Sequence, residues 1–555
     1  MSSTPEPDLG LTRLDAGALA QGLAALFWLP QAALLALAVQ RLADGAGLAA
    51  LVGPAGGLLL LGLARAACEA WGLRRLFAGA RAQLTGLRMR VASALAARSP
   101  LDRSRPASGL AASVIAEQAE AVLPWLVRYQ PARWRVMTVP PLIALVVASL
   151  SWTAALVLVM AAPLIPLFMA IIGWRAKAAS EAQLLQLGGM NAFLLDRLRG
   201  LATLRALDAV DATALRLREA AQTLRHRTMA VLRIAFLSSA VLELFAALGV
   251  AMVAVYVGFH LLGHLEFGAW GRRLTLGEGL FILLLAPAFF EPLRELSAVW
   301  HDRAAGEAAL DALRQLSRDG VALPGAGAAD IGLARHGAPS VAVRGLDFAH
   351  AGEAAFFENY ELQVAAGEHV ALLGPSGSGK TALLSLIAGL VPARRGEIAI
   401  GGVPLTDASA AALRTRIGWI GQKPHVFAGS VQANVALGRA GVDTAGVRAA
   451  MRFAALAEVE QAHPAAALGE GGAGLSGGEA VRLALARVAV HPQADLLLVD
   501  EPTAHLDTET ARRVIDALIE LARGKTLIAA THDPLLAARM GRVVRLDPVP
   551  ARKAA

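Results

Sequence analysis

One run of eight residues, Gly374-Pro375-Ser376-Gly377-Ser378-Gly379-Lys380-Thr381, fills every fixed position of the phosphate-binding loop pattern. Glycines let the backbone N–H groups of such a loop turn inward around phosphates, and the helix that follows points its positive end at them. We expect Lys380 to reach the outer phosphates and Thr381 to face a magnesium ion. The sequence therefore predicts that this chain binds a nucleoside triphosphate.

Two carboxylates follow a second apolar run, residues 496–499, much further along the chain. This run reads as a buried parallel strand, and open α/β sheets place their ligands at the carboxyl ends of such strands. Asp500 is suited to holding magnesium, and Glu501 to activating an attacking water. Shortly before them, Leu475-Ser476-Gly477-Gly478-Glu479 opens a helix rich in arginine and alanine. The start of that helix is expected to hold a second phosphate group.

With these motifs in this order, residues 338–550 resemble the nucleotide-binding domain of the ABC transporter superfamily, an α/β P-loop ATPase. The segment Leu475 to Glu479 matches the signature loop of that family, although Glu479 stands where glutamine is usual. The resemblance implies ATP and Mg²⁺ as the ligands. It implies a magnesium site formed by Thr381, Gln422 and Asp500.

The same resemblance assigns three further positions. Gln422 matches the lid glutamine, which senses magnesium and the membrane domain, and His532 matches the switch histidine that contacts the γ-phosphate. Asp507 matches the D-loop aspartate. His350 takes the place of the aromatic residue that stacks on adenine, a role that imidazole can also fill. A domain that binds ATP without hydrolysing it is the alternative, but such a domain needs neither Glu501 nor His532 around the γ-phosphate.

The rest of the chain has the composition of a membrane protein. It has 555 residues, 56% of them hydrophobic, which is too long for one core. Its single cysteine, Cys68, excludes a framework of intrachain disulfides. Residues 1–9 are polar, and we expect no cleavable signal peptide there. Six apolar runs are long enough to be membrane-spanning helices, at residues 18–39, 48–67, 136–150, 153–174, 234–262 and 274–293.

The basic residues predict the topology of these spans. Between Arg65 and Arg135 there are twelve arginines and four acidic residues, whereas the short connections near Asp44, Ser151 and Arg272 carry few cations. By the positive-inside rule the two long basic connections are cytoplasmic and the short ones external. The chain has a net charge of +8, but its sequence contains no basic face interleaved with aromatic residues, so a nucleic-acid partner is disfavoured.

Both long connections continue with helical periodicity, which predicts helices that extend well into the cytoplasm. Residues 103–106 and 199–202 are the expected turns at their tips, and such turns are expected to dock on the nucleotide-binding domain. A helix over residues 301–318 leaves the last span, and residues 320–340, rich in Gly, Ala and Pro, are expected to be a flexible linker. The predicted domains are 1–300 (transmembrane), 301–337 (connecting) and 338–550 (ATPase).

This order of six spans and one ATPase domain resembles the half-transporter layout of ABC exporters. The resemblance implies a head-to-tail dimer in which Ser476, Gly477, Gly478 and Asp507 act on the nucleotide of the partner. Among exporters, three segments look like the CydD half of the cysteine/glutathione exporters that support cytochrome bd assembly, namely residues 195–205, 283–294 and 501–507.

That likeness implies export of small thiols from cytoplasm to periplasm, a CydC-like partner in a heterodimer, and a place in the bacterial inner membrane with both termini and the ATPase domain in the cytoplasm. An exporter of haem, lipid or another hydrophobic compound is the alternative, as is an ATP-gated channel or regulatory subunit with little turnover. In the CydD-like segment 283–294, Ala288 stands where the family often has an acid.

Charged residues within the spans offer a separate indication, because an ionised side chain in hydrocarbon usually faces a cavity or a partner. Glu243, Glu291 and Arg294 are candidates for a cavity that receives a zwitterionic amino acid or peptide. The simpler interpretation, which we favour, is interfacial snorkelling or an interhelical ion pair. His260 and His264 are spaced to ligate metal or haem, but no carboxylate or cysteine completes a site.

Overall fold

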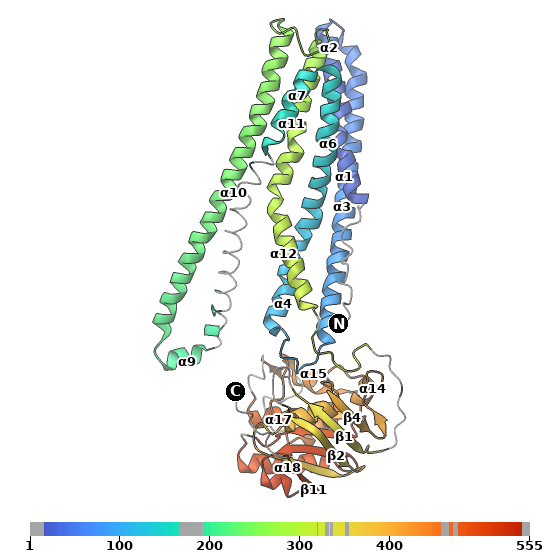
Figure 1. Cartoon of the computed structure of the whole chain (residues 1–555), viewed down its shortest axis with the longest axis vertical. Coiled ribbons are helices and arrows are strands. Elements are labelled where there is room, and N and C mark those ends of the chain that lie inside the picture. The colour runs from blue at the N-terminus through green and yellow to red at the C-terminus, as the bar shows by residue number, and fades with distance from the viewer. Residues whose placement is uncertain are drawn as a thin grey trace. The chain divides into compact units, whose positions relative to one another are not determined.

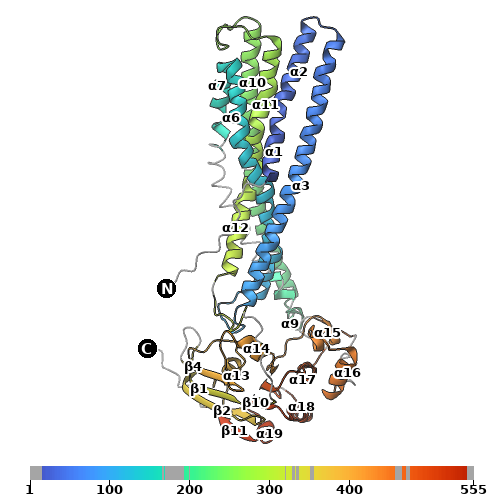
Figure 2. The same cartoon turned by 90° about the vertical axis from the view of Figure 1, so that its right-hand side faces the viewer.

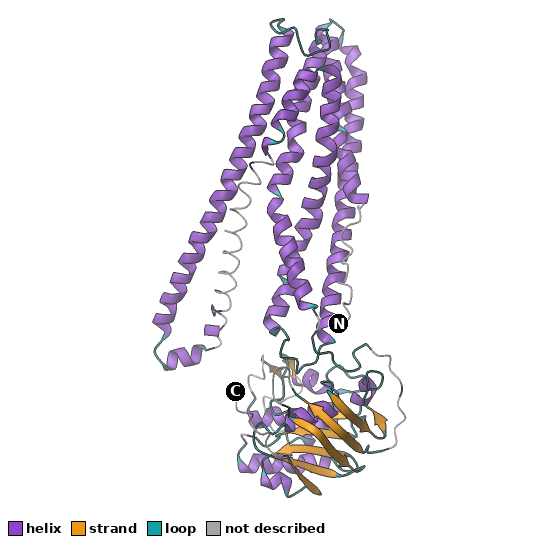
Figure 3. Cartoon of the chain, in the orientation of Figure 1, coloured by secondary structure: helices purple, strands orange, loops and turns teal. Residues whose placement is uncertain are grey.

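The structure, a computed structural model, divides into two compact units. The helical unit comprises Met1–Ala92 and Ala107–Ser317, and the α/β unit comprises Ser93–Pro106 and Arg318–Ala555 (Figure 3). The structure describes residues 16–546 apart from 166–167, 169–189, 191–192, 195, 199, 319, 328–331, 333–336, 350–354, 457–465, 470–474 and 505.

Long helices dominate the described part of the helical unit. They are α1 (Ala16–Leu26), α2 (Trp28–Ala43), α3 (Val52–Ala96), α6 (Gln130–Leu150), α7 (Trp152–Ala161), α10 (Val210–Leu261), α11 (Leu276–Ala298) and α12 (Trp300–Leu316). Shorter helical turns are η1 (Leu48–Leu51), α4 (Ser108–Ala116), η2 (Gln118–Ala121), α5 (Val122–Pro124), η3 (Trp125–Tyr129) and α9 (Leu201–Ala206).

Five helical stretches in the described residues are long and apolar enough to span a membrane: Ala16–Ala43, Leu48–Ala96, Ser108–Leu150, Glu243–Leu261 and Leu276–Leu316. The predicted fourth span, 153–174, begins in α7, and most of its second half lies outside the described residues. With 52 residues, α10 is about 78 Å long at 1.5 Å per residue, more than twice the ~30 Å of hydrocarbon (Figure 1). This length agrees with the predicted extension of helices beyond the membrane.

The short connection predicted near Ser151 is a tight turn, at which α6 ends and α7 begins. The buried Ser151 hydroxyl accepts a hydrogen bond from the Ala154 N–H (3.2 Å) and donates one to the Gly268 carbonyl (2.8 Å). Gly268 has a φ of +101°, and a Cβ there would lie 2.3 Å from the Tyr256 hydroxyl. Only glycine fits this position, so the α6–α7 turn is fixed to the segment that follows α10.

The α/β unit is built on two main sheets. The antiparallel sheet has the order β2-β1-β4-β5 and the parallel sheet the order β11-β3-β10-β9-β6, with a short pair β7-β8 beside them. The strands are β1 (Val341–Phe348), β2 (Phe357–Val364), β3 (His369–Leu373), β4 (Arg395–Ile400), β5 (Val403–Pro404), β6 (Ile417–Ile420), β7 (Gly429–Ser430), β8 (Ala467–Leu468), β9 (Leu496–Asp500), β10 (Thr526–Thr531) and β11 (Arg542–Arg545).

Helices cover these sheets (Figure 3) and bury the parallel strands completely along β9 and β10. They are α13 (Lys380–Ile387), α14 (Ala410–Arg414), α15 (Val431–Ala436), α16 (Thr444–Phe453), α17 (Gly477–Ala489), α18 (Thr508–Leu521) and α19 (Pro534–Ala537). Both strands predicted next to the motifs are present, as β3 and β9. Because their sheet is parallel, the residues that follow β3, β6, β9 and β10 meet at one edge.

The loop between α3 and α4 belongs to the α/β unit, although sequence reasoning placed it in the transmembrane domain. The Ser99 hydroxyl donates a hydrogen bond to the Leu390 carbonyl, which lies just after α13 in the same unit (2.6 Å). This contact agrees with the expected docking of the first turn. The second turn is broader than predicted: Gly200 begins it, α9 follows, and α10 starts at Val210, while Arg199 lies outside the described residues.

The described part of residues 320–340 is not the free linker that its composition predicts. The Ser99 N–H donates to the Val321 carbonyl and the Leu323 N–H to the Ala97 carbonyl, both at 2.8 Å, so the linker pairs with the loop between α3 and α4. Gly320 approaches that loop so closely that a Cβ would lie 2.3 Å from an Asp102 oxygen. Backbone hydrogen bonds fix the segment, and composition carries no sign of them. The connecting helix α12 groups with the helical unit.

Replacing Asp102 by alanine is expected to release this linker. The Asp102 carboxylate, 8% exposed, accepts hydrogen bonds from the Ser104 N–H (2.9 Å), the Ser104 hydroxyl (2.7 Å) and the Val321 N–H (3.0 Å). Alanine leaves these donors without an acceptor, which costs about 1–3 kcal/mol of folding free energy. Limited trypsin digestion should therefore cleave the Asp102→Ala chain faster within 318–340. Asp102→Asn, which keeps an acceptor oxygen, is the control; equal cleavage of all three chains would contradict the role of Asp102.

The hydrogen bonds to Asp102 also make the attachment of the linker depend on pH. Burial acts to raise the pKa of Asp102, but the hydrogen bonds from Ser104 and Val321 outweigh it and hold the pKa below the ordinary 3.8. A carboxyl whose pKa is lower in the folded state stabilises that state fully above its ordinary pKa. The attachment of the linker through Asp102 should therefore keep its full strength at neutral pH and weaken only as the pH falls below about 4.

Candidate nucleotide-binding site

The phosphate-binding loop connects β3 to α13. Gly377 and Gly379 have φ values of +84° and +88°, in the left-handed region that favours glycine. At Gly379 a Cβ would also lie 2.9 Å from the Phe357 ring, so no larger residue fits there. Lys380 begins α13 directly after this turn. The loop thus presents its backbone and the positive end of a helix at the edge of the parallel sheet, as an anion site requires.

Lys380 is the cation of this loop, and only 8% of it is exposed. Its ammonium group donates to the carbonyls of Gly374 (2.8 Å) and Pro375 (3.1 Å) and lies 3.5 Å from a carboxylate oxygen of Glu501. A buried ammonium among carbonyl oxygens at the mouth of the loop matches the charge of a triphosphate. Lys380, which is predicted to bind phosphate, and Glu501, the predicted catalytic carboxylate, therefore lie next to each other.

Asp500 provides the site for a metal ion. One of its oxygens accepts a hydrogen bond from the Thr381 hydroxyl (2.8 Å), and the other is buried with no hydrogen-bond partner. Burial raises the pKa of Asp500, and the neighbouring charge of Glu501 raises it further. A divalent cation would remove both penalties, and oxygen donors are those that Mg²⁺ prefers. Gln422 is exposed just after β6, whose Ile420 pairs with Val499 of β9, so it lies at the same edge.

Glu501 and His532 form the remaining pair of the site. The His532 Nδ1 lies 2.5 Å from a Glu501 oxygen, which joins the ends of β9 and β10. Glu501 is 8% exposed and has a φ of +48°, and its N–H donates to the Ala530 carbonyl (2.9 Å). The His532 side chain is mostly exposed. A buried carboxylate held by an imidazole beside the phosphate loop is equipped to take a proton from an attacking water.

The signature segment forms the start of α17. Ser476 caps this helix in a capping box: its hydroxyl accepts from the Glu479 N–H (3.3 Å), and the Glu479 carboxylate accepts from the Ser476 N–H (2.7 Å). Glutamate and glutamine both serve in a capping box, so the departure at Glu479 preserves the local structure.

Asp507 caps α18 in a similar way, accepting from the N–H groups of Glu509 (3.1 Å) and Thr510 (2.9 Å). The hydrogen bonds from Thr510 hold the pKa of Asp507 below its ordinary value. The two helix starts pack together, because a Cβ on Gly478 would lie 2.9 Å from the Thr510 methyl group.

The structure thus brings Lys380, Thr381, Asp500, Glu501 and His532 into one site within this chain. No hydrogen bond or ion pair of the described residues joins the signature segment to that site, which is the arrangement expected if the segment serves another subunit. His350, the predicted adenine-stacking residue, lies outside the described residues.

Replacing His532 by alanine is expected to lower ATP turnover about 100-fold, because Glu501 loses the group that orients it and the γ-phosphate loses a donor. ATP affinity should change little, since the loop around Lys380 remains. Steady-state phosphate release and nucleotide titration of the same preparation measure the two effects. Retained turnover would exclude His532 from the reaction. Replacement of the exposed His301 by alanine is the control.

The charged residues predicted within the spans form an ion-pair cluster. Arg294 of α11 bonds to both oxygens of Glu243 in α10 (2.8 and 3.0 Å) and to Glu291 in its own helix. The favoured interpretation, an interhelical ion pair, agrees with these contacts for Glu243 and Arg294. Glu291 also lines a cavity between α1, α2, α3, α6 and α11.

His260 and His264 do not come together. His260 is buried beside Tyr256 and accepts a hydrogen bond from the Leu274 N–H (3.3 Å), whereas the ring of His264 lies against Phe259. Within the described residues, no group of three or more His, Cys, Asp or Glu is positioned to hold a metal ion.

Sequence reasoning missed the other charged residues of the cavity, which are Arg65, Glu69, Arg135 and Glu295. The spacing of Arg65 and Glu69 by four residues at the end of an apolar run was a signal for two of them, because such a pair shares one helix face. Arg135 and Glu295 are far apart in sequence, and nothing in the chain indicates that they meet.

Comparison with known protein families places both units. Residues 357–504 match the family model of the ABC transporter, and residues 137–290 match that of the ABC transporter transmembrane region. The chain is also similar to the solved structure of a bacterial Atm1-family ABC exporter with ATP bound, with a TM-score of 0.77 over 96% of this chain and 94% of that one. At 21% identity, this similarity concerns the fold alone.

Curated relatives are similar over most of their length. The chain is 37% identical to the glutathione/L-cysteine transport system ATP-binding/permease protein CydD of Haemophilus influenzae, over 78% of this chain and 73% of that protein. The CydD protein of Escherichia coli is 36% identical with the same coverage. The CydC protein of Bacillus subtilis is 28% identical over 76% of this chain and 72% of its own length.

Proposed function

Because this chain belongs to the CydD family of ABC transporter subunits, we propose that it is one half of an ATP-driven exporter of small thiols, glutathione and cysteine. The proposal includes export from cytoplasm to periplasm in support of cytochrome bd assembly. The observation that carries the cargo is the 36–37% identity to two proteins named for glutathione/L-cysteine transport, over 78% of the chain. This identity is far more extensive than a match of the ATPase motifs alone would be.

The hydrolytic step in this proposal follows from the site at the sheet edge. The loop from Gly374 to Thr381 and the Lys380 ammonium hold the phosphates. Thr381, Asp500 and Gln422 would hold Mg²⁺, which would neutralise phosphate charge. Glu501 takes the proton of the attacking water. His532 orients Glu501 through the 2.5 Å contact, and in its doubly protonated form it also donates to the γ-phosphate. His350 stacks on the base.

The working unit is a head-to-tail heterodimer with a CydC-like half. In it, Ser476, Gly477 and Gly478 close over the nucleotide held by the partner, and Asp507 lies beside that site. Two features support this arrangement: the signature segment makes no hydrogen bond or ion pair to the phosphate loop of its own chain among the described residues, and CydC proteins are among the relatives.

The chain is a multi-pass membrane protein. We place it in the bacterial inner membrane with both termini and the ATPase domain in the cytoplasm, on the distribution of arginine along the sequence. Contact of the Ser99 loop with Leu390 gives ATP binding a route to the membrane helices, because α3 ends at that loop and α4 begins there.

Two alternatives are weaker. An exporter of haem, lipid or another hydrophobic compound would be expected to have a neutral cavity, whereas this cavity is lined by two arginines and three glutamates. An ATP-gated channel or regulatory subunit with little turnover has no use for the Glu501–His532 pair beside Lys380.

The test is transport in inverted vesicles that contain this chain and a CydC-like half from the same genome. Uptake of labelled glutathione and cysteine is measured with and without ATP, and Glu501→Gln serves as the inactive control. ATP-dependent uptake that disappears in the control supports thiol export. ATP hydrolysis without thiol uptake would retain the transporter and refute the cargo.

A further inference from the structure

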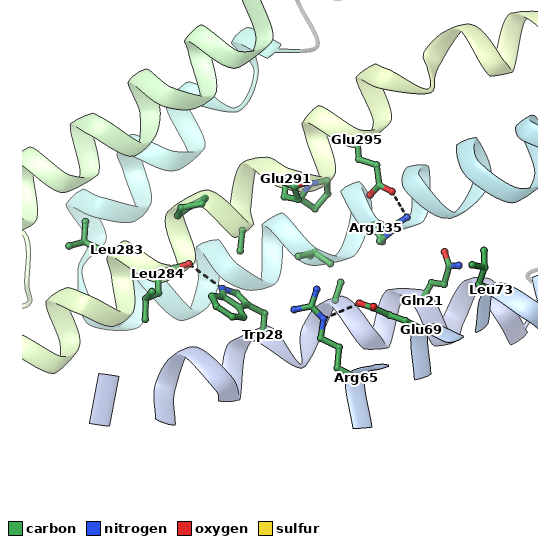
Figure 4. A pocket seen from close by; sticks show the side chains of 15 residues that line it. Gln21, Trp28, Arg65, Glu69, Leu73, Arg135, Leu283, Leu284, Glu291 and Glu295 are labelled. Carbon is green, nitrogen blue, oxygen red and sulfur yellow. Dashed lines mark hydrogen bonds and ion pairs between the residues drawn. The ribbon is translucent and has the colours of Figure 1, made fainter. Parts of the chain in front are cut away.

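A cavity of about 700 Å³ lies within the helical unit (Figure 4). It is lined by α1, α2, α3, α6 and α11, helices that are distant in sequence and that Figure 2 labels. This volume is within the ~300–1,000 Å³ typical of small-molecule sites. Its polar lining is one glutamine and five charged residues, Gln21, Arg65, Glu69, Arg135, Glu291 and Glu295, among apolar neighbours such as Trp28 and Pro287. Such a concentration of charge is unusual within membrane-spanning helices, where each ionised group is costly.

The charges are arranged as ion pairs. Arg135 of α6 donates to Glu295 of α11 at 2.5 Å, and Arg65 donates to Glu69 within α3 at 2.9 Å (Figure 4). Glu291 is bonded to Arg294. The charged side chains that line the cavity are not sealed in the core, because their exposed fractions run from 23% (Arg135) to 62% (Glu291). The lining of the cavity therefore carries paired charges that a ligand can reach.

The pair Arg135–Glu295 is incompletely satisfied. The Arg135 Nε is buried and has no hydrogen-bond partner, although a guanidinium can donate from all three nitrogens. A ligand carboxylate is the group that guanidinium recognises best, through two parallel hydrogen bonds. Such a carboxylate would displace Glu295 and leave it in need of a cation.

These contacts decide the class of ligand. A ligand with only negative charge would bind Arg135 and leave the Glu295 carboxylate unpaired. A ligand with only positive charge would bind Glu295 and leave the Arg135 guanidinium unpaired. Within a membrane-spanning segment, an ionised side chain that is left without a partner is costly. A zwitterion satisfies both members of a split pair, since its carboxylate takes the arginine and its ammonium takes the glutamate.

We propose that this cavity is a zwitterion site, in which Arg135 and Arg65 bind the carboxylates of a short peptide or amino acid and Glu295 binds its ammonium group. This inference rests on the proposed function and deepens it by naming the groups that select the cargo. Two arginines suit a ligand with two carboxylates and one ammonium, such as glutathione. Among the described residues, the lining contains no histidine, cysteine or methionine to ligate haem iron.

The test uses the reconstituted complex of this chain with a CydC-like half and measures the concentration of peptide that half-maximally stimulates ATP hydrolysis. Four probes are compared: glutathione, S-methylglutathione, glutathione diethyl ester, which lacks carboxylates, and N-acetylglutathione, which lacks the ammonium. The variants are Arg135→Gln and Glu295→Gln. Arg81→Gln is the matched control, because Arg81 pairs with Glu120 (2.8 Å) away from the cavity.

For the wild-type complex, the N-acetyl compound should need an about 10- to 100-fold higher concentration than glutathione, the loss expected for one charged hydrogen bond. The diethyl ester, which loses the contacts of both carboxylates, should need at least as large an increase. Arg135→Gln should impose a similar loss on glutathione but little further loss on the ester. Glu295→Gln should do the same for glutathione and the N-acetyl compound. Arg81→Gln should behave as wild type.

Equal responses of the wild-type complex to all four probes would overturn the inference, as would Arg135→Gln and Glu295→Gln complexes that respond like Arg81→Gln. If either variant fails to fold, the four probes on the wild-type complex decide alone. Failure of the thiol cargo is a separate result. In that case S-methylglutathione, which has no thiol, still stimulates in a manner that depends on Arg135, whereas no response to any zwitterion overturns the cavity assignment as well.

Discussion

Glu501→Gln is expected to abolish steady-state ATP hydrolysis while ATP still binds. The substitution keeps the volume and the hydrogen-bonding capacity of the side chain beside His532 but removes the proton acceptor. General bases contribute about 10²- to 10⁴-fold to a rate, so turnover should fall by that factor. The phosphate loop and Lys380 are unchanged, so affinity for ATP should be retained. Phosphate release and binding of a fluorescent ATP analogue measure the two quantities on one preparation.

Removal of the negative charge next to Lys380 has a second consequence. The Lys380 ammonium lies 3.5 Å from the Glu501 carboxylate, which competes with phosphate for it. The Glu501→Gln variant should therefore bind ATP at least as tightly as the wild type. Glu509→Gln is the matched control, since Glu509 is exposed in the first turn of α18 and bonds to Arg513. Undiminished hydrolysis in Glu501→Gln would remove Glu501 from the mechanism.

The nucleotide site was predictable because its parts are local motifs tied to strand ends. The loop from Gly374 to Thr381 and the pair Asp500-Glu501 each carry their structural context in adjacent residues, and a parallel sheet then brings them to one edge. The contact between His532 and Glu501 follows from the same topology, since β9 and β10 are neighbours. The resemblance to ABC transporters supplied their roles.

The cavity was not predictable in the same way. Sequence reasoning chose Glu243, Glu291 and Arg294 because they interrupt apolar runs. Arg294 pairs with both glutamates, and Glu291 is the one of the three that lines the cavity. Arg135 and Glu295 are 160 residues apart and meet only through the packing of α6 on α11. The linker shows the same limit, because backbone hydrogen bonds to the Ser99 loop leave no trace in composition.

Substitution of Gly477 tests the proposed dimer, because a side chain at this position does not disturb packing within the chain itself. It is the first residue of α17, and a Cβ built on it meets nothing within 4 Å, whereas its neighbour Gly478 is confined by Thr510. Nothing within the described part of this chain therefore requires glycine at position 477. If the signature segment closes over a nucleotide held by the partner, the requirement comes from that other subunit.

Gly477→Val is accordingly expected to leave the fold and the ATP affinity of this chain's own loop intact while it lowers turnover of the heterodimer. A side chain at this position would hold the N-terminus of α17 away from the γ-phosphate, and loss of such charge-stabilising donors costs about 10²- to 10³-fold in rate. The measurements are ATP binding to this chain alone and hydrolysis by the complex. Gly109→Val in α4, where a Cβ also meets nothing within 4 Å, is the matched control. Full turnover in Gly477→Val would mean that the segment does not act across the dimer, since valine at the helix start cannot coexist with a phosphate held by the backbone there.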